Sequence, residues 1–239
     1  MKIALIGYGK MGKIIEQIAL DRGHEIVLKI DITNQHELTI DNLKKADVAI
    51  EFTIPASAIN NYKLCFEAGI PVVSGTTGWL GKKDEVISEM NQREGTFFYA
   101  SNFSLGVNLF FALNKKLASL MANRPEYDIQ MEEVHHTQKL DAPSGTALTL
   151  AEGLFENHPG KKSWTLDEPQ TAGQLHIRAI REGQVPGIHR IKYESDVDHI
   201  LIEHSAKSRQ GFALGAVLAA EFSIGKKGLL SMNDLLNLS

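Results

Sequence analysis

A glycine motif near the amino terminus constrains the fold of this chain more than any other feature. Gly7-Tyr8-Gly9-Lys10-Met11-Gly12 is a G-x-G-x-x-G sequence between the apolar run Lys2–Ile6 and the helix-periodic segment Met11–Arg22. Asp31 stands nineteen residues beyond Gly12, just after the next apolar run, Glu25–Ile30. A strand before the glycines, a helix after them and an acid downstream are the context in which this motif binds a dinucleotide.

Each glycine of the motif has its own physical task. Gly7 makes a tight turn, Gly9 lets the backbone approach a pyrophosphate, and Gly12 allows the helix to pack closely on the strand. The helix N-terminus then offers N–H groups and the positive end of its dipole to the phosphates. We therefore expect the whole loop to contact the cofactor, from Gly7 through Tyr8, Gly9, Lys10 and Met11 to Gly12.

Asp31 is expected to influence which dinucleotide binds. Its carboxylate can accept hydrogen bonds from the hydroxyls of an adenosine ribose and would repel a 2′-phosphate, which favours NADH. Lys10 and Lys13 lie in or just after the glycine loop and could neutralise that phosphate. The sequence therefore predicts NADH, NADPH or both as cofactors.

The first part of the chain is predicted to be an α/β dinucleotide-binding domain, residues 1–104. Short apolar runs alternate there with helix-periodic segments, which is typical of a Rossmann-type parallel sheet covered on both faces. Beyond the first two strands, the predicted elements are strands Asp47–Phe52, Ile70–Ser74 and Phe97–Ala100 and helix Ala56–Ala68.

Residues 105–207 are predicted to form a second, α+β domain for substrate binding and oligomerisation. After a long helix, Leu105–Leu120, four segments alternate polar and apolar residues, as in a mixed, mainly antiparallel sheet with one face buried. These segments are Tyr127–His135, Gln174–Glu182, Gly187–Glu194 and His199–Ser205. Helix Thr146–Phe155 and a long loop, Asn157–Gly173, separate the first two of these segments. We expect that loop to be mobile or to cover a ligand.

The end of the chain is predicted to return to the first domain. Gly211–Phe222 and Leu229–Leu238 are both expected to be helical, with a break at residues 225–228. The C-terminal helices, residues 208–239, would then complete the dinucleotide-binding domain.

Composition excludes several classes of protein. The net charge of −4, from 25 basic and 29 acidic residues, lacks the basic excess of a nucleic-acid binder. No apolar stretch approaches the roughly 20 residues of a membrane-spanning helix, and no cleavage site follows the first apolar run. Cys65 is the single cysteine and cannot close an intrachain disulfide. We expect a cytoplasmic protein without nucleic-acid or membrane partners.

One segment gathers the side chains needed for acid-base chemistry on an anion. It runs Glu133-Val134-His135-His136-Thr137-Gln138-Lys139-Leu140-Asp141-Ala142-Pro143-Ser144-Gly145-Thr146. Histidine can deliver a proton near neutral pH, so His135 or His136 is a candidate general acid. Lys139 supplies positive charge, and Ser144, Gly145 and Thr146 present N–H groups at a helix start. The combination suits a small carboxylated substrate that is protonated while it receives a hydride.

Two simpler interpretations of this segment exist. Paired histidines are often structural, and Ser144 can be a plain N-cap. A metal site is not expected, because adjacent strand residues point to opposite faces and His135 and His136 therefore do not share an ion.

The string H-H-x-x-K-x-D-A-P-S-G-T-A at His135–Ala147 resembles the signature of the 4-hydroxy-tetrahydrodipicolinate reductase family. Gly75-Thr76-Thr77-Gly78 resembles the family's GTTG turn, and residues 100–108 resemble its A-x-N-F-S-x-G-V-N hinge. The motifs occur in the family's order and span nearly the whole chain. The resemblance implies NAD(P)H-dependent reduction of the dehydrated form of 4-hydroxy-tetrahydrodipicolinate to tetrahydrodipicolinate, on the route to diaminopimelate and lysine.

The same resemblance implies roles for individual residues. His135 matches the acid-base histidine and Lys139 the proton-donating lysine, while His136, Gly145 and Thr146, with Ser144 beside them, match the substrate-carboxylate binders. Further cofactor contacts are implied for Gly75, Thr76, Thr77, Ala100, Ser101, Asn102 and Phe103. A homotetramer built by the second domain's sheet is implied as well. Gly187-Ile188-His189 departs from the family's Gly-Glu-His pattern, and His189 is expected to be only a strand residue.

Two other functions remain open from the sequence. An amino-acid dehydrogenase, such as an aspartate dehydrogenase-like protein, also joins a Rossmann domain to a sheet-forming domain. A non-catalytic NADH sensor would bind the cofactor without turnover and leave the histidines and Lys139 without a task.

Overall fold

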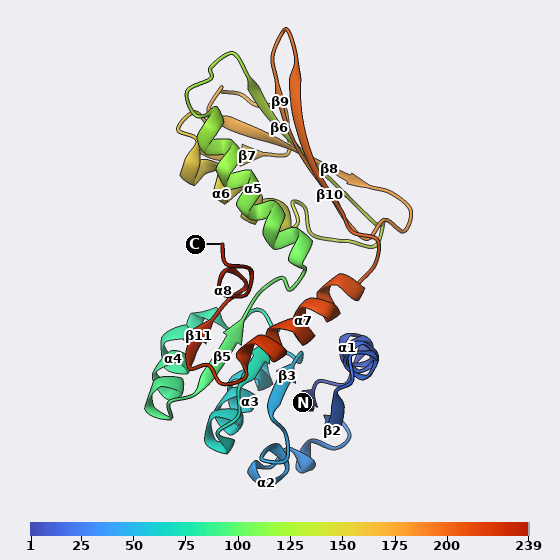
Figure 1. Ribbon diagram of the computed structural model, residues 1–239. Coiled ribbons are helices and arrows are strands. Elements are labelled where there is room, and N and C mark those ends of the chain that lie inside the picture. The colour runs from blue at the N-terminus through green and yellow to red at the C-terminus, as the bar shows by residue number, and fades with distance from the viewer. Residues whose placement is uncertain (239) are drawn as a thin grey trace. The chain divides into compact units, whose positions relative to one another are not determined.

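The computed structural model describes residues 1–238, and the chain divides into two compact units (Figure 1). Unit 1 is Met1–Leu105 together with the chain from Gln210 onward, and unit 2 is Gly106–Arg209. The boundaries expected from the sequence lie after residues 104 and 207. No helix within residues 1–238 is long and apolar enough to cross a membrane.

Unit 1 is built on a six-stranded sheet in the order β11-β5-β4-β3-β1-β2, and every neighbouring pair is parallel. The strands are β1 (Lys2–Ile6), β2 (Glu25–Ile30), β3 (Val48–Glu51), β4 (Val72–Ser74), β5 (Thr96–Tyr99) and β11 (Gly228–Leu230). The chain leaves β1 for β2 on one side and then returns to β3 on the other side. The carboxyl ends of β1 and β3 therefore form a topological switch point, where such sheets bind ligands.

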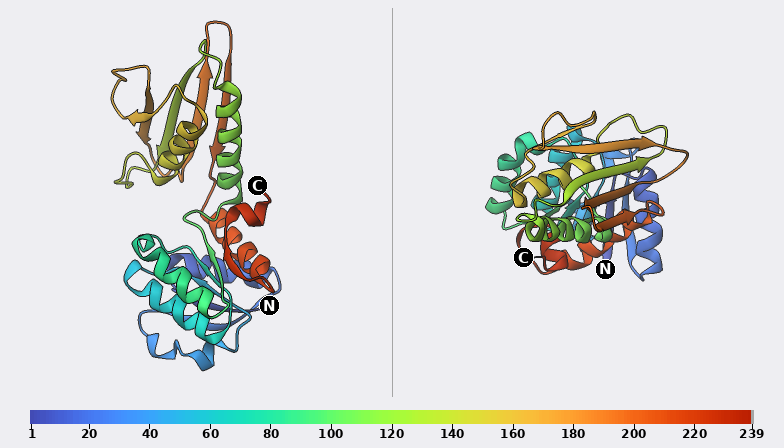
Figure 2. Two further views of the ribbon diagram at one scale, coloured as in Figure 1. Left: turned by 90° about the vertical axis from the view of Figure 1, so that its left-hand side faces the viewer. Right: turned by 90° about the horizontal axis from the view of Figure 1, so that it is seen from above.

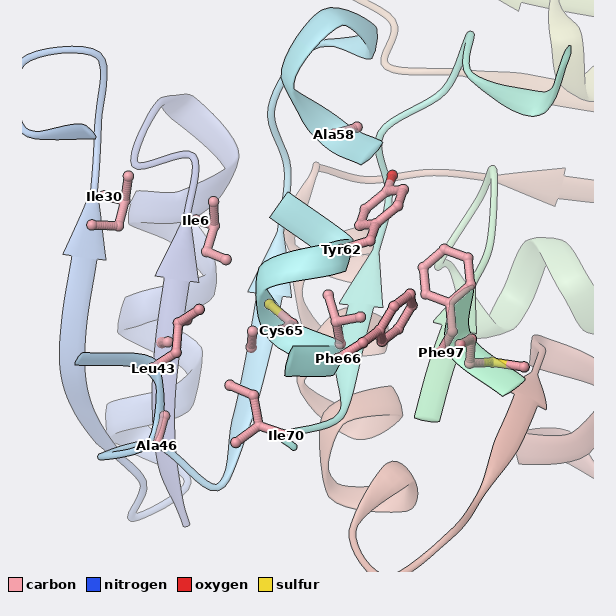
Figure 3. Packing of buried hydrophobic residues seen from close by; sticks show 14 of the residues in the cluster. Ile6, Ile30, Leu43, Ala46, Ala58, Tyr62, Cys65, Phe66, Ile70 and Phe97 are labelled. Carbon is pink, nitrogen blue, oxygen red and sulfur yellow. The ribbon is translucent and has the colours of Figure 1, made fainter. Parts of the chain in front are cut away.

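Helices cover both faces of this sheet, which confirms the predicted Rossmann-type architecture. One face carries α1 (Lys10–Asp21), α7 (Gln210–Ser223) and α8 (Met232–Leu236). The other carries α2 (Ile40–Leu43), α3 (Pro55–Ala68) and α4 (Lys83–Gln92), with short 3-10 turns at Gln35–Glu37 and Leu80–Lys82. Figure 3 shows Tyr62, Cys65 and Phe66 of α3 packed among side chains of the strands. Burial on both faces explains why the strands are continuous apolar runs.

The prediction of a helix over Leu229–Leu238 is confirmed for α8 but was wrong for its first residues. Gly228–Leu230 is strand β11, which pairs with Thr96–Phe98 along β5. The helix begins only after Ser231, where a capping box with Asp234 starts α8. A short apolar run of leucines fits a strand or a helix, and here the free edge of β5 decides the outcome.

Unit 2 contains a five-stranded mixed sheet in the order β10-β9-β6-β8-β7. Its strands are β6 (Asp128–His135), β7 (Ser163–Thr165), β8 (Gln174–Arg181), β9 (Ile188–Glu194) and β10 (His199–Ser205). Two pairs are antiparallel and two are parallel, so the sheet is mixed as predicted but without an antiparallel majority. The helices α5 (Leu105–Met121) and α6 (Gly145–Asn157) pack on one face of it (Figure 2).

The segment Asn157–Gly173 is not a plain loop, because it contains strand β7, which pairs with β8. Lys161 in this segment is buried and donates hydrogen bonds to the Asp128 carboxylate at 3.1 Å and to the Gln174 carbonyl at 3.1 Å. These contacts fix the start of the segment against the sheet. So short an edge strand has no hydrophobic pattern that would reveal it in the sequence.

Alternation along β6 places the functional residues on the helix-covered face of the sheet. Ile129 and Met131 are buried in the core, and Glu133 and His135 continue the same face. The apolar core of unit 2 therefore ends in a buried polar group near the N-terminus of α6.

Candidate active site

The glycine loop adopts the geometry that the sequence predicted. Gly7 has a φ of 98°, and a Cβ there would lie 2.0 Å from the Phe52 carbonyl oxygen. A Cβ on Gly12 would lie 2.5 Å from the Gly7 carbonyl oxygen, whereas one on Gly9 would meet nothing within 4 Å. Gly7 and Gly12 are thus required by close packing of the protein itself. Gly9 instead leaves open space at the start of α1.

The N-terminus of α1 is available for an anion. Gly9 is the N-cap and provides no side-chain hydrogen bond to the helix amides, while Lys10 and Met11 form its first turn. The Tyr8 side chain is engaged with Glu16 and Lys29. Its hydroxyl donates a hydrogen bond to Glu16, and Lys29 Nζ lies 5.2 Å from its ring centroid. The backbone of this loop, rather than the tyrosine hydroxyl, is therefore the part suited to phosphate.

A cavity of about 550 Å³ lies beside the glycine loop in unit 1. It is lined by the ends of β1, β2 and β3 together with α3, including Gly7, Gly9, Asp31 and Thr53. Asp31 is exposed at its rim, and one carboxylate oxygen accepts the Ile32 amide at 2.8 Å. None of the described residues that line the cavity is a lysine or an arginine. Thr53 was missed by the sequence analysis, although its position directly after a strand of the sheet was available as a signal.

The other predicted cofactor residues follow β4 and β5 at the same edge of the sheet. Thr76 is buried, and its hydroxyl accepts the Thr53 amide at 2.8 Å. Phe103 packs on Phe52 with a centroid distance of 5.6 Å, and Ala100 is buried beside it. The remaining members of the two segments are Gly75, Thr77, Ser101 and Asn102. All the predicted cofactor residues thus stand at the carboxyl ends of parallel strands.

The site in unit 2 is centred on Glu133, which the sequence analysis did not assign. Its carboxylate is fully buried and accepts the Ser144 amide at 3.0 and 3.2 Å and Arg181 Nη2 at 3.1 Å. Burial alone would raise the pKa of Glu133, but hydrogen bonds from His189, Ser144 and Arg181 lower it to about 2. Glu133 is therefore an anion that ties β6 to β8, to β9 and to the start of α6.

Two histidines face this carboxylate. His135 Nδ1 lies 3.6 Å and His189 Nε2 lies 3.7 Å from the same Glu133 oxygen, and the two rings are 5.1 Å apart. His189 Nε2 also lies 3.1 Å from the Ser144 hydroxyl. His189 was expected to be only a strand residue, and in the structure this residue of β9 also contacts the buried carboxylate. The pairing of Glu133 with His189 across β6 and β9 places them side by side, which sequence alone does not reveal.

Burial makes His135 a poor proton donor in this state. Desolvation lowers its pKa to about 4, although the Glu133 charge opposes that shift. The imidazole is therefore neutral at pH 7. His136 is only half-buried and follows the end of β6, so the two histidines occupy different environments.

Lys139 stands in the loop between β6 and α6. Its ammonium group lies 2.8 Å from both carboxylate oxygens of the exposed Asp141. Arg181 holds the backbone of this loop, since its guanidinium donates to the Lys139 carbonyl at 3.3 Å and to the Asp141 carbonyl at 2.6 Å. The same guanidinium contacts Glu133, so Arg181 links the loop to the buried carboxylate.

The N-terminus of α6 closes the site. Ser144 is its N-cap, and the hydroxyl accepts the Ala147 amide at 3.2 Å. Gly145 and Thr146 precede the first intrahelical hydrogen bonds, so their amides have no acceptor within the helix. Gly145 is exposed, and a Cβ there would meet nothing within 4 Å. This end of the helix can therefore receive a carboxylate.

Glu133, His135 and His189 also have the spacing of metal ligands, with ligand atoms within 4.8 Å of one another. From the sequence, only His135 and His136 suggested themselves as a pair of metal ligands. The guanidinium of Arg181 already lies against the Glu133 carboxylate, and its charge opposes a second cation there. Acid-base chemistry on an anion is the use that suits these residues best.

The lowered pKa of His135 predicts how stability depends on pH. A histidine with a depressed folded-state pKa binds more protons when unfolded, so its contribution is complete above pH 6.5 and is lost as pH falls towards 4. We expect His135→Asn to reduce the loss of unfolding free energy between pH 7 and 4.5 by about 2 kcal/mol. Urea denaturation of both proteins at the two pH values measures this, and equal losses would contradict it.

Comparisons with known proteins give a consistent result. The models for the N-terminus and the C-terminus of dihydrodipicolinate reductase match residues 1–103 and 106–236. A 4-hydroxy-tetrahydrodipicolinate reductase of Christiangramia forsetii is 51% identical over 239 residues, covering 99% of this chain and 98% of the relative. A protein of the same name from Ralstonia pickettii is 34% identical, with both chains fully covered.

One solved structure shows the likeness in fold. A dipicolinate-bound dihydrodipicolinate reductase from Paenisporosarcina aligns with a TM-score of 0.78 at 23% sequence identity. The alignment covers 98% of each chain. Both the parallel Rossmann-type sheet of unit 1 and the mixed sheet of unit 2 therefore have counterparts in one known protein.

Proposed function

Because the chain belongs to the dihydrodipicolinate reductase family, we infer that it reduces 4-hydroxy-tetrahydrodipicolinate with NADH or NADPH in diaminopimelate and lysine biosynthesis. The observation that carries this conclusion is the 51% identity to a reductase of that name over 99% of the chain. It favours the reductase over an amino-acid dehydrogenase and over a non-catalytic NADH sensor.

The cofactor fits the residues at the edge of the parallel sheet. Gly9 offers open space and uncapped amides for the pyrophosphate, and Asp31 offers a carboxylate to the adenosine ribose. The segments 75–77 and 100–103 would receive the other half of the dinucleotide. When bound, the reduced cofactor supplies the hydride.

The substrate carboxylates would bind at the loop and helix start of unit 2. The amides of Gly145 and Thr146 and the imidazole of His136 would hold one carboxylate, with Ser144 fixing the helix end. Lys139 would exchange its contact with Asp141 for a contact with the substrate. A dicarboxylate suits this site because the solved relative is described with dipicolinate bound.

The reaction adds one hydride and one proton and releases water, so one residue must deliver a proton. Lys139 is the better donor of the two catalytic candidates, because its ammonium carries three N–H groups and burial leaves His135 neutral. The neutral imidazole of His135 could then accept a hydrogen bond through the ring nitrogen that does not face Glu133. Glu133 and His189 would keep that ring in place.

The test is a coupled assay. Pyruvate and aspartate semialdehyde are converted to the substrate by the preceding synthase, and oxidation of NADH and of NADPH is followed separately. Rapid oxidation that needs both the synthase and this protein supports the proposal. A protein that binds the cofactors but oxidises neither would overturn it and favour the sensor.

Asp31 should favour NADH, because no lysine or arginine lines the cavity beside it. We expect Asp31→Ser to raise the ratio of kcat/KM for NADPH over NADH by about tenfold, since a charge that repels the 2′-phosphate is removed. Glu37→Gln, which removes an exposed acid outside the cavity lining, is the control and should leave the ratio unchanged. Steady-state rates with both cofactors measure the effect, and an unchanged ratio in Asp31→Ser contradicts it.

The mixed sheet is proposed to build a homotetramer. The sheet face opposite α5 and α6 carries the exposed Leu201. Charged side chains on this face form ion pairs with one another, as Glu132 does with Arg178 and Arg190. A neutralised, partly apolar face suits a second copy of the same face. Sedimentation measures the assembly.

A cytoplasmic location is proposed because the single cysteine, Cys65, is buried and free, as a reducing compartment permits. Fractionation of cells tests this location.

A further inference from the structure

Glu51, the last residue of β3, is a buried carboxylate that the proposed chemistry does not use. Its exposed fraction is 0%, and it forms no ion pair within residues 1–238. Buried carboxylates normally pair with a cation or collect several hydrogen bonds, because desolvation of an isolated charge is costly. The partners of Glu51 therefore indicate why it is there.

All its side-chain partners are neutral donors. Ser74 Oγ donates at 2.7 Å and Thr76 Oγ1 at 3.1 Å, and the Thr53 hydroxyl donates as well. Asn61 Nδ2 of α3 lies 3.4 Å away. The Tyr62 hydroxyl contacts Ser74 Oγ at 2.7 Å and is the polar end of a ring that otherwise packs in the apolar core (Figure 3).

One carboxylate thus joins three segments that end at the cofactor edge of the sheet. Thr53 follows β3, Thr76 follows β4, and Asn61 belongs to α3. The Thr53 amide also donates to the Thr76 hydroxyl at 2.8 Å, and the Gly75 amide donates to the Glu51 carbonyl at 3.0 Å. Thr53 and Asn61 line the cavity of about 550 Å³.

The topology assigns the strand ends of this sheet to the two halves of the cofactor. The ends of β1 and β2 serve the pyrophosphate and the adenosine ribose, and the other half of a dinucleotide crosses the switch point towards the strands beyond. In this sheet those strands are β3, β4 and β5. The Gly75–Thr77 turn after β4 therefore faces the nicotinamide half, whereas Thr53 and Asn61 line the cavity beside Asp31.

We propose that Glu51 is a positioning residue for the nicotinamide half of the cofactor, acting by fixing the Gly75–Thr77 turn through Ser74 and Thr76; this rests on the proposed function. An ionised carboxylate only accepts hydrogen bonds, which matches a site surrounded by hydroxyl and amide donors. An amide at the same position would point two N–H donors at other donors. The charge, rather than the size of the side chain, is what the arrangement requires.

The test compares Glu51→Gln and Glu51→Asp with the unmodified protein. Dissociation constants are measured for NADH and for ADP, which carries the adenosine and pyrophosphate without the nicotinamide. We expect Glu51→Gln to weaken NADH about tenfold and ADP less than about twofold. Glu51→Asp remains an acceptor and should recover part of the NADH affinity. Equal weakening of NADH and ADP, or unchanged NADH affinity, would overturn the proposal.

A second variant keeps the proposal testable. If Glu51→Gln does not fold, Ser74→Ala removes a single donor, and it should weaken NADH about threefold and leave ADP unchanged. Equal effects on both ligands in that variant would also overturn the proposal. The affinities need no substrate, so a failure of the coupled assay would reject the reductase function without affecting the result for Glu51.

Discussion

Lys139→Met is expected to lower kcat by about two to four orders of magnitude, because it removes the residue proposed to deliver the proton. It should also weaken binding of pyridine-2,6-dicarboxylate about tenfold, because a charge-assisted contact to a carboxylate is lost. NADH affinity should not change, since Lys139 belongs to unit 2 and the cofactor cavity to unit 1. Turnover kinetics and titrations with the two ligands measure the three quantities.

Two controls separate catalysis from general effects of charge. Lys162→Met removes an exposed lysine of the same unit and should leave kcat and inhibitor binding unchanged. Asp141→Asn removes the carboxylate that faces Lys139 in the ligand-free protein, so it should not reproduce the loss of kcat. A Lys139→Met protein with nearly normal kcat would exclude Lys139 as the proton donor.

The parallel sheet could be predicted from sequence because its strands are buried on both faces. Its strands β1 and β2 lie where the apolar runs placed them, and the glycine loop has the packing that its motif implies. In the mixed sheet, β10 lies where its alternating run placed it. In these elements local pattern and tertiary environment agree. The short helices α2 and α4 were not predicted, because their apolar periodicity is weak and packing on neighbouring helices stabilises them.

The candidate acid-base site was predicted only in part. His135, Lys139 and Ser144 lie close in sequence and were found by reading one segment. Arg181 and His189 reach Glu133 from other strands, and their contacts depend on strand order and register. Period-two alternation along β6 could have linked Glu133 with His135, because both lie on the face that Ile129 and Met131 bury. No pattern in the sequence gives the neighbours of β6.

The pKa of His135 shows a second limit of sequence reasoning. With its ordinary pKa, a histidine can act as a general acid near neutral pH, and His135 was a candidate for that reason. In the structure, burial lowers the pKa of His135 to about 4. The protonation state of a group depends on desolvation and on charges brought by distant parts of the chain. Residue type therefore predicted which segment carries titratable side chains, and the three-dimensional environment determines which of them is charged.

Gly7→Ala should be among the most destabilising single substitutions in unit 1. Its φ of 98° is unfavourable for alanine, and the added Cβ would lie 2.0 Å from the Phe52 carbonyl oxygen. Left-handed backbone costs about 1–2 kcal/mol and overpacking about 1–3 kcal/mol, so we expect a loss of about 3 kcal/mol or more. Urea denaturation measures this loss, and NADH binding should fall with it.

Gly9→Ala is the matched variant, because it separates folding from binding within the same loop. A Cβ on Gly9 meets nothing within 4 Å of the protein, and its φ of −86° is ordinary for alanine. Stability should therefore change by less than about 1 kcal/mol. NADH affinity should still fall about tenfold or more, because the methyl group would occupy the space reserved for the pyrophosphate. Normal NADH affinity in Gly9→Ala would mean that the cofactor phosphates do not approach this loop.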